Sequence, residues 1–433
     1  KYMNYSNNLA KIIKSKKAHI GIIGMGYVGL PLALLAAKNN FNVICYERDP
    51  YRFNMLKKKK SYFNNIPLKS LKLFSRKTKF YQNLKDISKC DILIICLPTP
   101  LKKDKPDLSH IKNAIDLLIP QLRKGQLLIL ESTSYPGTTR EEICNKLDLK
   151  FILGKDLFVG FSSERINPGV NDSKIEKIPK VVSGYSSKCL NLSEKFYSAL
   201  FQRIIKAKSL EQAEFSKLLE NIYRSVNIGF INEMKFIADK FNLDIYEILS
   251  LASTKPYGFT RFDPGPGVGG HCIPIDPQYL YWKTVEKGFN PEFIKLSAKI
   301  NLDVTKFIYN KVLSRINKIN KKKSNIKILI LGVAYKKNLD DVRASASKRL
   351  INFLIKKKFS FVSYSDPFIP TCEFTKKIKK KSLILNSKIL KKTDIVILAT
   401  DHDKFNYNLI KKYSNFIIDC RGKFKVNQNI VRG

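Results

Sequence analysis

The sequence predicts an α/β protein with two doubly wound parallel-sheet domains joined by a helical middle domain. Its 433 residues exceed what one ordinary hydrophobic core accommodates. Apolar runs typical of strands alternate with helical patterns between residues 18 and 200, and the same alternation returns after residue 325. Alternation of this kind implies parallel strands with helices on both faces of the sheet.

Nine strand candidates define the two sheets. Those of the first sheet are 18–24, 41–47, 91–98, 126–132 and 158–162, and those of the second are 326–335, 359–367, 394–400 and 416–420. A polar stretch, 318–325, marks a linker before the second sheet. We therefore expect a basic N-terminal tail (1–17), a first sheet domain (18–208), a helical domain (209–320) and a second sheet domain (321–433).

The helical region contains two long helices and a loop. From about Ser209, apolar residues at helical spacing predict a helix that ends near Asn242, which can adopt the left-handed conformation of a helix C-cap. Asp244 is placed to cap a shorter helix after it. A loop rich in Gly and Pro follows (255–277), and a second long helical pattern covers 291–319.

The composition is strongly basic. Lys and Arg number 79 against 36 Asp and Glu, for a net charge of +43. A nucleic-acid-binding protein can have this composition. However, the Lys residues are spread along the chain with many Asn, Ile, Phe and Tyr, as an AT-rich genome produces, and we find no nucleic-acid motif. We favour compositional drift, with a mild attraction for anionic ligands.

The sequence favours the cytoplasm. No run reaches the roughly 18 apolar residues that a membrane span needs, and the first 17 residues lack the apolar core of a secretory signal. None of the eight cysteines forms a C-x-x-C pair, which argues against a disulfide framework or a zinc cluster, and we expect no metal. Most cysteines lie in apolar runs, as Cys45 and Cys96 do, and only Cys272 has unusual surroundings.

A glycine-rich turn follows the first predicted strand and opens a helix. It is a G-x-G-x-x-G, made of Gly24, Met25, Gly26, Tyr27, Val28 and Gly29. Glycines in this context permit a tight turn and close approach of a pyrophosphate to the backbone. Glu47 closes the second strand 23 residues after Gly24, where a carboxylate would bind ribose hydroxyls. A carboxylate there favours NAD⁺ over NADP⁺, although the neighbouring Arg48 leaves NADP⁺ open.

The Gly/Pro-rich loop contains a second motif. Cys272 follows two glycines and His271, and Asp276 stands four residues later. A polar cysteine in flexible backbone beside an acid is atypical of a core residue and indicates a nucleophile. His271 is either a general base or a structural histidine.

Eight motifs together resemble the UDP-glucose/GDP-mannose dehydrogenase family, over nearly the whole chain from residue 18. In chain order they are GMGYVGLPLA, CLPTPL, ESTSYPGTT, SERINPG, EFSKLLENIYR, FDPGPGVGGHCIPIDPQYL, LGVAYKKNLDDVRASAS and ATDHDKFNY. The block around Cys272 is the most specific. The segment ASTKPYGF and the block after it look most like the UDP-N-acetylglucosamine 6-dehydrogenase branch.

The resemblance implies Rossmann-like sheet domains, NAD as cofactor, a UDP-sugar substrate, a homodimer or larger homo-oligomer, and neither nucleic acid nor membrane as partner. It implies the following site residues. The catalytic set is Cys272 as nucleophile, Lys217, Asn221, Asp276, Glu164 as general base and Thr133 as a residue that orients water. Cofactor contacts would come from residues 24–29, Glu47, Thr99 and Arg343, and substrate contacts from Lys217, Asn221, Gly267, Gly269, Gly270 and Lys336.

Two positions depart from the family pattern. Ser163 stands where the family frequently has Pro before the glutamate. Pro168 stands where the UDP-glucose branch has a second glutamate, which argues against that branch and leaves Glu164 as the only acid of its loop.

The residues suit a four-electron oxidation of a sugar CH₂OH to a carboxylate. A thiolate at Cys272 would capture the aldehyde as a thiohemiacetal, and a second oxidation would give a thioester. Lys217 and Asn221 would stabilise the oxyanion, and Glu164 or Asp276 would activate the hydrolytic water. We expect UDP-N-acetylglucosamine as substrate, for synthesis of a polysaccharide precursor. The alternatives are UDP-N-acetylmannosamine, UDP-N-acetylgalactosamine, UDP-glucose, GDP-mannose and, remotely, a non-catalytic nucleic-acid-binding protein.

Overall fold

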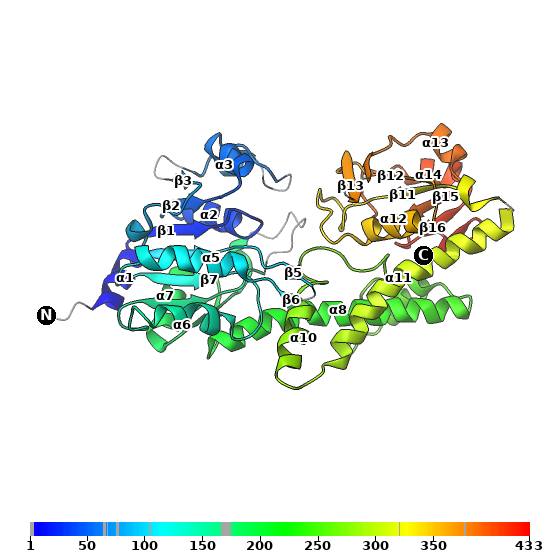
Figure 1. Ribbon diagram of the computed structural model, residues 1–433. Helices are drawn as coiled ribbons and strands as arrows, with labels where there is room; N and C mark the ends of the chain where they lie inside the picture. The colour runs from blue at the N-terminus through cyan, green and yellow to red at the C-terminus, as the bar shows by residue number, and fades with distance from the viewer. Residues whose placement is uncertain are drawn as a thin grey trace. The chain divides into compact units, whose positions relative to one another are not determined.

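The computed structural model describes residues 4–63, 66, 68–74, 78–103, 105–165, 175–319, 321–375 and 378–433, with the backbone alone at 68 and 69. The chain divides into two compact units, Lys1–Glu220 with Gln278–Phe289, and Asn221–Pro277 with Asn290–Gly433. Each unit contains one large, mostly parallel sheet (Figure 1), and helices connect the two sheets in the sequence. The predicted α/β fold class is confirmed. The domain boundaries given above stay predictions.

The first unit is built on an eight-stranded sheet with the order β10-β9-β8-β7-β4-β1-β2-β3. The strands are β1 (His19–Ile23), β2 (Asn42–Tyr46), β3 (Lys79–Tyr81), β4 (Ile92–Ile95), β7 (Leu127–Leu130), β8 (Phe158–Phe161), β9 (Lys180–Gly184) and β10 (Ile204–Lys206). All five expected strands are present, and they pair in parallel. They are buried on both faces, which explains why each reads as a continuous apolar run.

The sheet differs from the prediction at both edges. β9 pairs antiparallel with β8, and β10 then runs parallel to β9. Antiparallel neighbours need no crossover helix, and the described part of the β8–β9 connection contains only a 3₁₀ helix, Ile175–Lys177. The sequence analysis missed β9, which begins with a lysine, and the two edge strands β10 and β3, which have just three residues each.

Helices and short elements complete the first unit. They are α1 (Tyr5–Lys14), α2 (Gly29–Lys38), α3 (Pro50–Lys57), α4 (Leu68–Leu71), α5 (Ser109–Leu118), a π-helix (Thr139–Cys144), α6 (Asn145–Leu147), α7 (Ser187–Ser198) and the hairpin β5 (Leu101–Lys102) and β6 (Lys105–Pro106). Part of the expected N-terminal tail is therefore helical. Leu9 and Ile13 of α1 are buried in the core of this unit, because they lie four residues apart on one helix face.

Long helices follow, as predicted. They are α8 (Leu210–Lys240), α9 (Ile245–Ala252), α10 (Asp276–Glu286) and α11 (Glu292–Ile319). Asn242 has a φ of 56° just after α8, and the Asp244 carboxylate accepts a hydrogen bond from the Tyr246 N–H at the start of α9. Both predicted caps are confirmed. The division between the two units falls inside α8, after Glu220.

The second unit contains a five-stranded parallel sheet with the order β12-β11-β15-β16-β17. Its elements are β11 (Lys327–Leu331), α12 (Ala346–Lys356), β12 (Phe361–Ser365), β13 (Thr371–Thr375), β14 (Ile378–Lys381), α13 (Ser387–Lys392), β15 (Ile395–Leu398), α14 (Tyr407–Tyr413), β16 (Ile417–Asp419) and β17 (Ile430–Arg432). The strand order reverses between β11 and β15, and ligands of such sheets bind beyond the carboxyl ends of the strands at this switch point.

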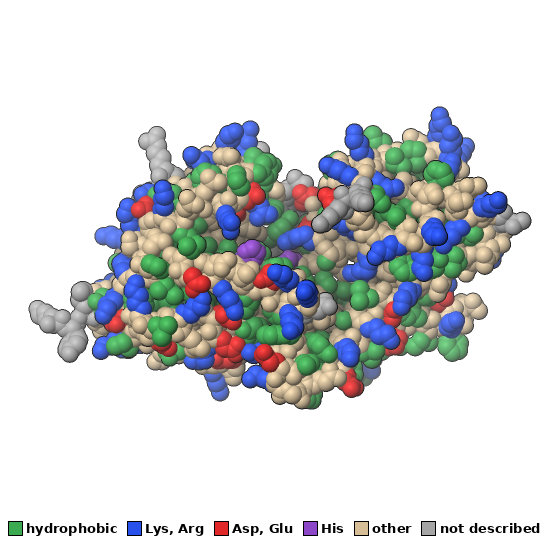
Figure 2. All heavy atoms as spheres, viewed as in Figure 1, with side chains coloured by type: hydrophobic (Ala, Val, Ile, Leu, Met, Phe, Trp, Pro, Cys, Tyr) green, Lys and Arg blue, Asp and Glu red, His purple; other side chains and the backbone are tan. Residues whose placement is uncertain are grey.

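Lysines and arginines are spread over the face seen in Figure 2 and do not gather in a single patch there. Within the described residues, no helix combines the length and the apolar character that crossing a bilayer requires.

Candidate active site

The glycine-rich turn lies between β1 and α2, and each of its glycines has a different structural reason. Gly24 has a φ of 94°. A Cβ at Gly29 would lie 1.9 Å from the Gly24 carbonyl oxygen, so only glycine lets α2 pack against the turn. A Cβ at Gly26 would meet nothing within 4 Å. The open space at Gly26, next to the N-terminus of α2, fits the pyrophosphate of a dinucleotide.

Glu47 connects the end of β2 to this turn. Its Oε2 accepts a hydrogen bond from the Met25 N–H at 3.2 Å, and its Oε1 accepts one from the Asp49 N–H at 2.9 Å. The side chain is nearly buried. Tyr62 donates to the Met25 carbonyl at 2.5 Å. Glu47 therefore fixes the turn as well as placing an acid at the edge where a ribose would lie.

Thr99 and Thr133 come together at the carboxyl ends of the neighbouring strands β4 and β7. The Thr99 hydroxyl donates to the Thr133 carbonyl oxygen at 2.7 Å. The same loop is held further along by Glu214 of α8, which accepts hydrogen bonds from the Gly137 N–H (2.5 Å) and the Thr139 N–H (2.8 Å). Burial raises the pKa of Glu214 to about 7, against the effect of these donors.

Glu164 and Lys217 also lie together in the first unit, both nearly buried. The Lys217 ammonium donates to the Glu164 backbone carbonyl at 2.5 Å. The Glu164 side chain contacts Lys180, whose ammonium is 3.3 Å from Oε2. Ser163 precedes Glu164 and its carbonyl accepts from the same ammonium. Pro168, the other departure from the family pattern, lies outside the described residues.

Cys272 differs from the other cysteines, as the sequence predicted. Seven of the eight are buried, and Cys272 is exposed. Its carbonyl accepts hydrogen bonds from the Ile275 N–H (3.1 Å) and the Asp276 N–H (2.8 Å), so the cysteine lies in a tight turn that leads into α10. An exposed thiol on a turn fixed by a helix start is suited to act as a nucleophile.

Asn221 and Asp276 are in direct contact within the second unit. The Asn221 amide donates to Asp276 Oδ2, and Arg224 donates to the Asn221 carbonyl oxygen. Asn221 and Asp276 are nearly fully buried. Asn221 lies four residues after Lys217 on α8, the spacing that puts both on one helix face.

The loop 332–345 joins β11 to α12 and carries Lys336 and Arg343. Arg343 forms a bidentate pair with Asp341, with Nη2 to Oδ2 at 2.7 Å. Burial lowers the pKa of Lys336, and the neighbouring Arg224 cation lowers it further. The Arg343 carbonyl accepts from the Gly270 N–H at 3.0 Å, so this loop and the cysteine loop are joined through their backbones.

The glycines before Cys272 make that junction possible. Cβ atoms at Gly269 and Gly270 would lie 2.9 and 2.8 Å from Tyr335 of the 332–345 loop. Gly267 has a φ of 113° and approaches the Asn301 carbonyl. Burial, followed by the Arg343 cation, lowers the pKa of His271, which keeps its imidazole neutral. A neutral imidazole is compatible with both roles considered for His271.

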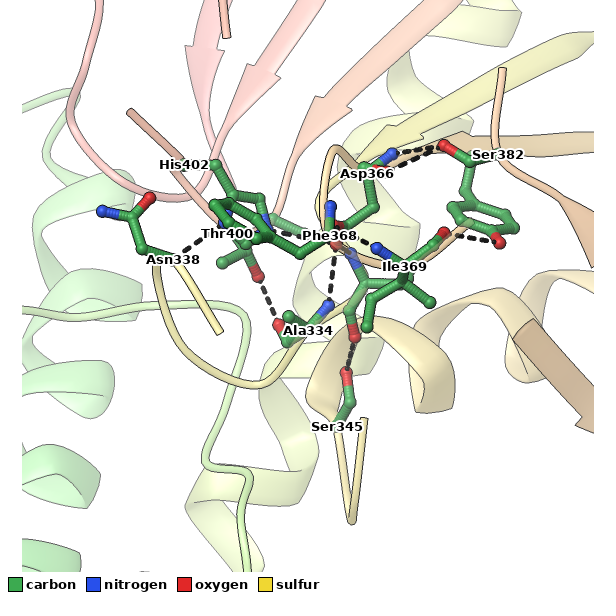
Figure 3. A network of polar contacts seen from close by, with 12 residues as sticks. Ala334, Asn338, Ser345, Asp366, Phe368, Ile369, Ser382, Thr400 and His402 are labelled. Carbon is green, nitrogen blue, oxygen red and sulfur yellow. Dashed lines mark hydrogen bonds and ion pairs between the residues drawn. The ribbon is translucent and has the colours of Figure 1, made fainter. Parts of the chain in front are cut away.

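A buried polar network fixes the 332–345 loop (Figure 3). Asp366, after β12, accepts hydrogen bonds from the Val333 and Ala334 N–H groups at 2.7 and 3.0 Å, and His402 Nδ1 accepts from the Asn338 N–H at 2.9 Å. Asp366 and His402 are themselves paired. The network therefore holds the part of the 332–345 loop that contains Lys336.

Sequence reasoning missed Lys180, Glu214, Arg224 and Asp366. It also missed Glu131, whose carboxylate lies 3.0 Å from the Lys180 ammonium. A charge directly after or within an apolar run, as in QLLILE and PKVVSG, is the signal that could have revealed Glu131 and Lys180. Within the described residues, no group of three or more His, Cys, Asp or Glu side chains could hold a metal ion.

Comparison with known proteins explains the order of these features. Three family models match successive parts of the chain: the NAD binding domain of the UDP-glucose/GDP-mannose dehydrogenase family at residues 18–202, its central domain at 211–303 and its UDP binding domain at 329–426. The chain belongs to the UDP-glucose/GDP-mannose dehydrogenase family. It is a nucleotide-sugar dehydrogenase, and its cofactor is NAD, for which the turn at residues 24–29 and Glu47 provide a fitting site.

Relatives of this dehydrogenase cover nearly its full length. Protein CapL of Staphylococcus aureus is 35% identical over 410 residues, 93% of this chain and 94% of CapL. A UDP-N-acetyl-D-glucosamine 6-dehydrogenase of Pseudomonas aeruginosa is 32% identical, covering 82% of this chain and 84% of its own. The solved structure of a UDP-D-ManNAc dehydrogenase from Pyrococcus horikoshii matches with a TM-score of 0.85 and 29% identity, over 94% of this chain and 96% of that one.

Proposed function

We propose that this dehydrogenase oxidises the C6 hydroxymethyl group of a UDP-N-acetylhexosamine to a carboxylate, with UDP-N-acetylglucosamine as the first candidate substrate. The observation that carries the proposal is the exposed Cys272 on a fixed turn, next in sequence to the buried Asp276–Asn221 contact, in a chain with an NAD binding and a UDP binding domain. The product would serve as a polysaccharide precursor, and we place the enzyme in the cytoplasm.

UDP-N-acetylmannosamine is the second candidate. Several relatives bear the name UDP-N-acetyl-D-mannosamine dehydrogenase, among them one from Pyrococcus horikoshii that is 32% identical over 420 residues. The P. aeruginosa relative with the glucosamine name is equally identical over 360 residues. The two substrates differ only in configuration at C2. Relatives with both names support an N-acetylhexosamine as the sugar, whereas their equal identities do not distinguish the two epimers.

The reaction needs two successive oxidations, and NAD supplies the chemistry by accepting a hydride in each. The chain's own residues do the rest. Cys272 Sγ adds to the C6 aldehyde and holds it on the enzyme as a thiohemiacetal. The second oxidation converts this adduct to a thioester. A water molecule then attacks C6, the C–S bond breaks, and the carboxylate leaves.

The charged and polar side chains have complementary roles in this scheme. Lys217 and Asn221 stabilise the oxyanion that develops on the C6 oxygen during addition and hydrolysis. Their positions are set by the Glu164 carbonyl and by Asp276, respectively. Thr133 orients the attacking water, and Glu164 or Asp276 takes its proton.

Residues around the nucleotide complete the proposal. The 332–345 loop brings Lys336 to the phosphates or the sugar of the substrate, and Arg343 to NAD. Gly267, Gly269 and Gly270 contact the UDP-sugar through their backbone, in a loop whose close packing against the Asn301 carbonyl and Tyr335 leaves no room for a Cβ at these positions. Thr99 and Gly24 to Gly29 contact NAD.

We further propose a homodimer or a larger homo-oligomer. The long helix α8 exposes a series of large apolar side chains at close to half of their surface or more: Phe215, Leu219, Tyr223, Phe230 and Ile237. Such side chains along one helix are typical of an interface between chains. Light scattering on a size-exclusion column tests this, and a monomer at micromolar concentration would contradict it.

NADH production against a panel of nucleotide sugars tests the substrate. The panel contains UDP-N-acetylglucosamine, UDP-N-acetylmannosamine, UDP-N-acetylgalactosamine, UDP-glucose and GDP-mannose. We expect the highest kcat/KM with UDP-N-acetylglucosamine and two NADH per sugar. A higher value with UDP-N-acetylmannosamine would move the assignment to the other epimer, and a preference for UDP-glucose or GDP-mannose would refute the N-acetylhexosamine class. A DNA mobility-shift assay at varied salt tests the remote nucleic-acid alternative.

A further inference from the structure

A buried cation lies behind Glu164. Lys180 is the first residue of β9, and its side chain is 2% exposed. Its ammonium lies 3.0 Å from Glu131 Oε2 and 3.3 Å from Glu164 Oε2, and it donates to the Ser163 carbonyl at 3.3 Å. Three acceptors thus match the three hydrogens of one ammonium. Fully buried lysines are rare, and breaking such a pair costs several kcal/mol.

The groups around this cation come from several elements. The Tyr197 hydroxyl of α7 donates to Glu131 Oε1, and the Tyr197 and Phe201 rings lie 5.2 and 5.3 Å from the Lys180 ammonium. Cys96, which directly follows β4, is buried near both glutamates and Lys180, and burial raises the pKa of its thiol. Cys96 and Tyr197 are therefore neutral, and they leave the charge balance to Lys180 and the two glutamates.

The other side of Glu164 faces groups that are bound elsewhere. Lys217 of α8 donates to the backbone carbonyl of Glu164. The Arg165 N–H donates to Glu164 Oε1 at 2.6 Å, while the Arg165 guanidinium pairs with Glu220 at 2.6 Å. The cation that contacts the Glu164 carboxylate is thus the buried Lys180 ammonium, while the neighbouring Arg165 guanidinium pairs with Glu220.

The electrostatic balance keeps Lys180 charged. Burial lowers its pKa, but Glu131 and Glu164 raise it above the ordinary value overall. Burial raises the pKa of Glu131, while Lys180 and Tyr197 counteract this. The ammonium therefore stays the most basic group of the cluster, and the positive charge remains next to Glu164.

We propose that Lys180 is a positioning residue that orients the Glu164 carboxylate as the base for hydrolysis of the Cys272 thioester. This inference rests on the proposed function and assigns the activation of water to Glu164 rather than to Asp276. In the step, the water oxygen bonds to C6 and Glu164 takes the water proton. The C–S bond then breaks, Cys272 leaves as a thiolate, and the sugar carboxylate is the product.

The experiment compares four full-length variants in the NADH assay and by rapid-quench mass spectrometry of the Cys272 peptide. Lys180→Met removes the charge and keeps the length of the side chain. Lys180→Arg keeps the charge. Tyr197→Phe removes a hydrogen bond to the same Glu131 without touching Glu164, and is the matched control. Glu164→Gln tests the role of the base itself.

Lys180→Met should lower kcat about 10- to 100-fold, less than the roughly 10²- to 10⁴-fold that a general base itself contributes, because Glu164 is still present but no longer held in place. It should also accumulate the acyl adduct on Cys272, with the first NADH burst retained. Lys180→Arg should restore at least part of kcat. Tyr197→Phe should lower the melting temperature and accumulate no acyl adduct.

Two outcomes would overturn the proposal. The first is a folded Lys180→Met enzyme with the kcat of the native enzyme and no adduct, while Glu164→Gln is impaired. The second is a Tyr197→Phe enzyme that accumulates as much adduct as Lys180→Met. If Lys180→Met does not fold, the double variant Lys180→Met/Glu131→Gln, which removes one charge of each sign, must accumulate the same adduct. Full turnover by Glu164→Gln would instead refute the proposed role of Glu164.

Discussion

His402 Nε2 lies 3.1 Å from Asp366 Oδ2, and both side chains are completely buried in the second unit. Because His402 Nδ1 accepts a hydrogen bond from the Asn338 N–H, the ring proton of the neutral imidazole must be on Nε2, where it is donated to Asp366. The pair binds the 332–345 loop at two places, because His402 accepts from Asn338 and Asp366 accepts from the backbone N–H groups of Val333 and Ala334 (Figure 3).

We expect His402→Leu to weaken UDP binding through the loop that carries Lys336. The variant leaves the Asn338 N–H without its acceptor, at a cost of about 1–3 kcal/mol, and removes one of the three hydrogen bonds that Asp366 Oδ2 accepts. Titration calorimetry with UDP should show at least a tenfold weaker Kd, and NAD binding should change less. Tyr407→Phe is the control, because Tyr407 donates only to the His402 carbonyl outside the loop. Equal Kd values for UDP in His402→Leu and the native enzyme would exclude this role.

The same aspartate predicts an acid-dependent stability. Burial acts to raise the pKa of Asp366, but the hydrogen bond from His402 and the N–H donors of Ala334 and Phe368 outweigh it and lower the pKa. A lowered folded-state pKa stabilises the fold above the unfolded value of about 3.9 and loses this contribution as the pH falls through the folded value. Urea unfolding between pH 2 and 6 should show a loss below about pH 4. Asp366→Asn should be less stable at pH 6 and depend less on pH, and an unchanged slope would contradict the assignment.

Two glycines of the NAD turn should respond in opposite ways to alanine. Gly26→Ala adds a methyl group where the protein has no atom within 4 Å, so stability should not change, while KM for NAD should rise at least tenfold if the cofactor lies there. Gly29→Ala puts Cβ 1.9 Å from the Gly24 carbonyl and should lower stability by several kcal/mol. Thermal unfolding and NAD kinetics measure both. An unchanged KM in Gly26→Ala would place the pyrophosphate elsewhere.

Cys272→Ser should lose the complete four-electron oxidation. An alcohol is less acidic than a thiol and its ester is a less reactive acyl donor, so turnover should stall on the enzyme. Mass spectrometry of digested enzyme, quenched with substrate and NAD, should find the adduct of the native enzyme on the Cys272 peptide. Cys45→Ala, at a fully buried position in the first core, should cost about 1 kcal/mol of stability with normal chemistry. An adduct on another cysteine would remove the thioester mechanism.

The sequence by itself determined the features whose signal is local. Apolar runs specified the central strands of both sheets but not β3, β9, β10 or β17. Asn242 and Asp244 marked the helix ends, and the glycines of residues 24–29 specified a turn before a helix. The exposure of Cys272 also followed from its neighbours in the chain. Such signals can be read from sequence because backbone sterics, capping and periodic burial act within a few residues.

Tertiary structure alone decided which side chains share a charge or a hydrogen bond. Lys180 meets Glu131 from 49 residues away, and His402 meets Asp366 from 36 residues away. No local pattern records these distances, because parallel strands bring their ends together only after intervening helices have crossed the sheet. β9 also reverses direction beside β8, which no propensity predicted. The reacting groups could therefore be read from the sequence, whereas the order of the strands decided which charged side chains contact them, as Lys180 contacts Glu164.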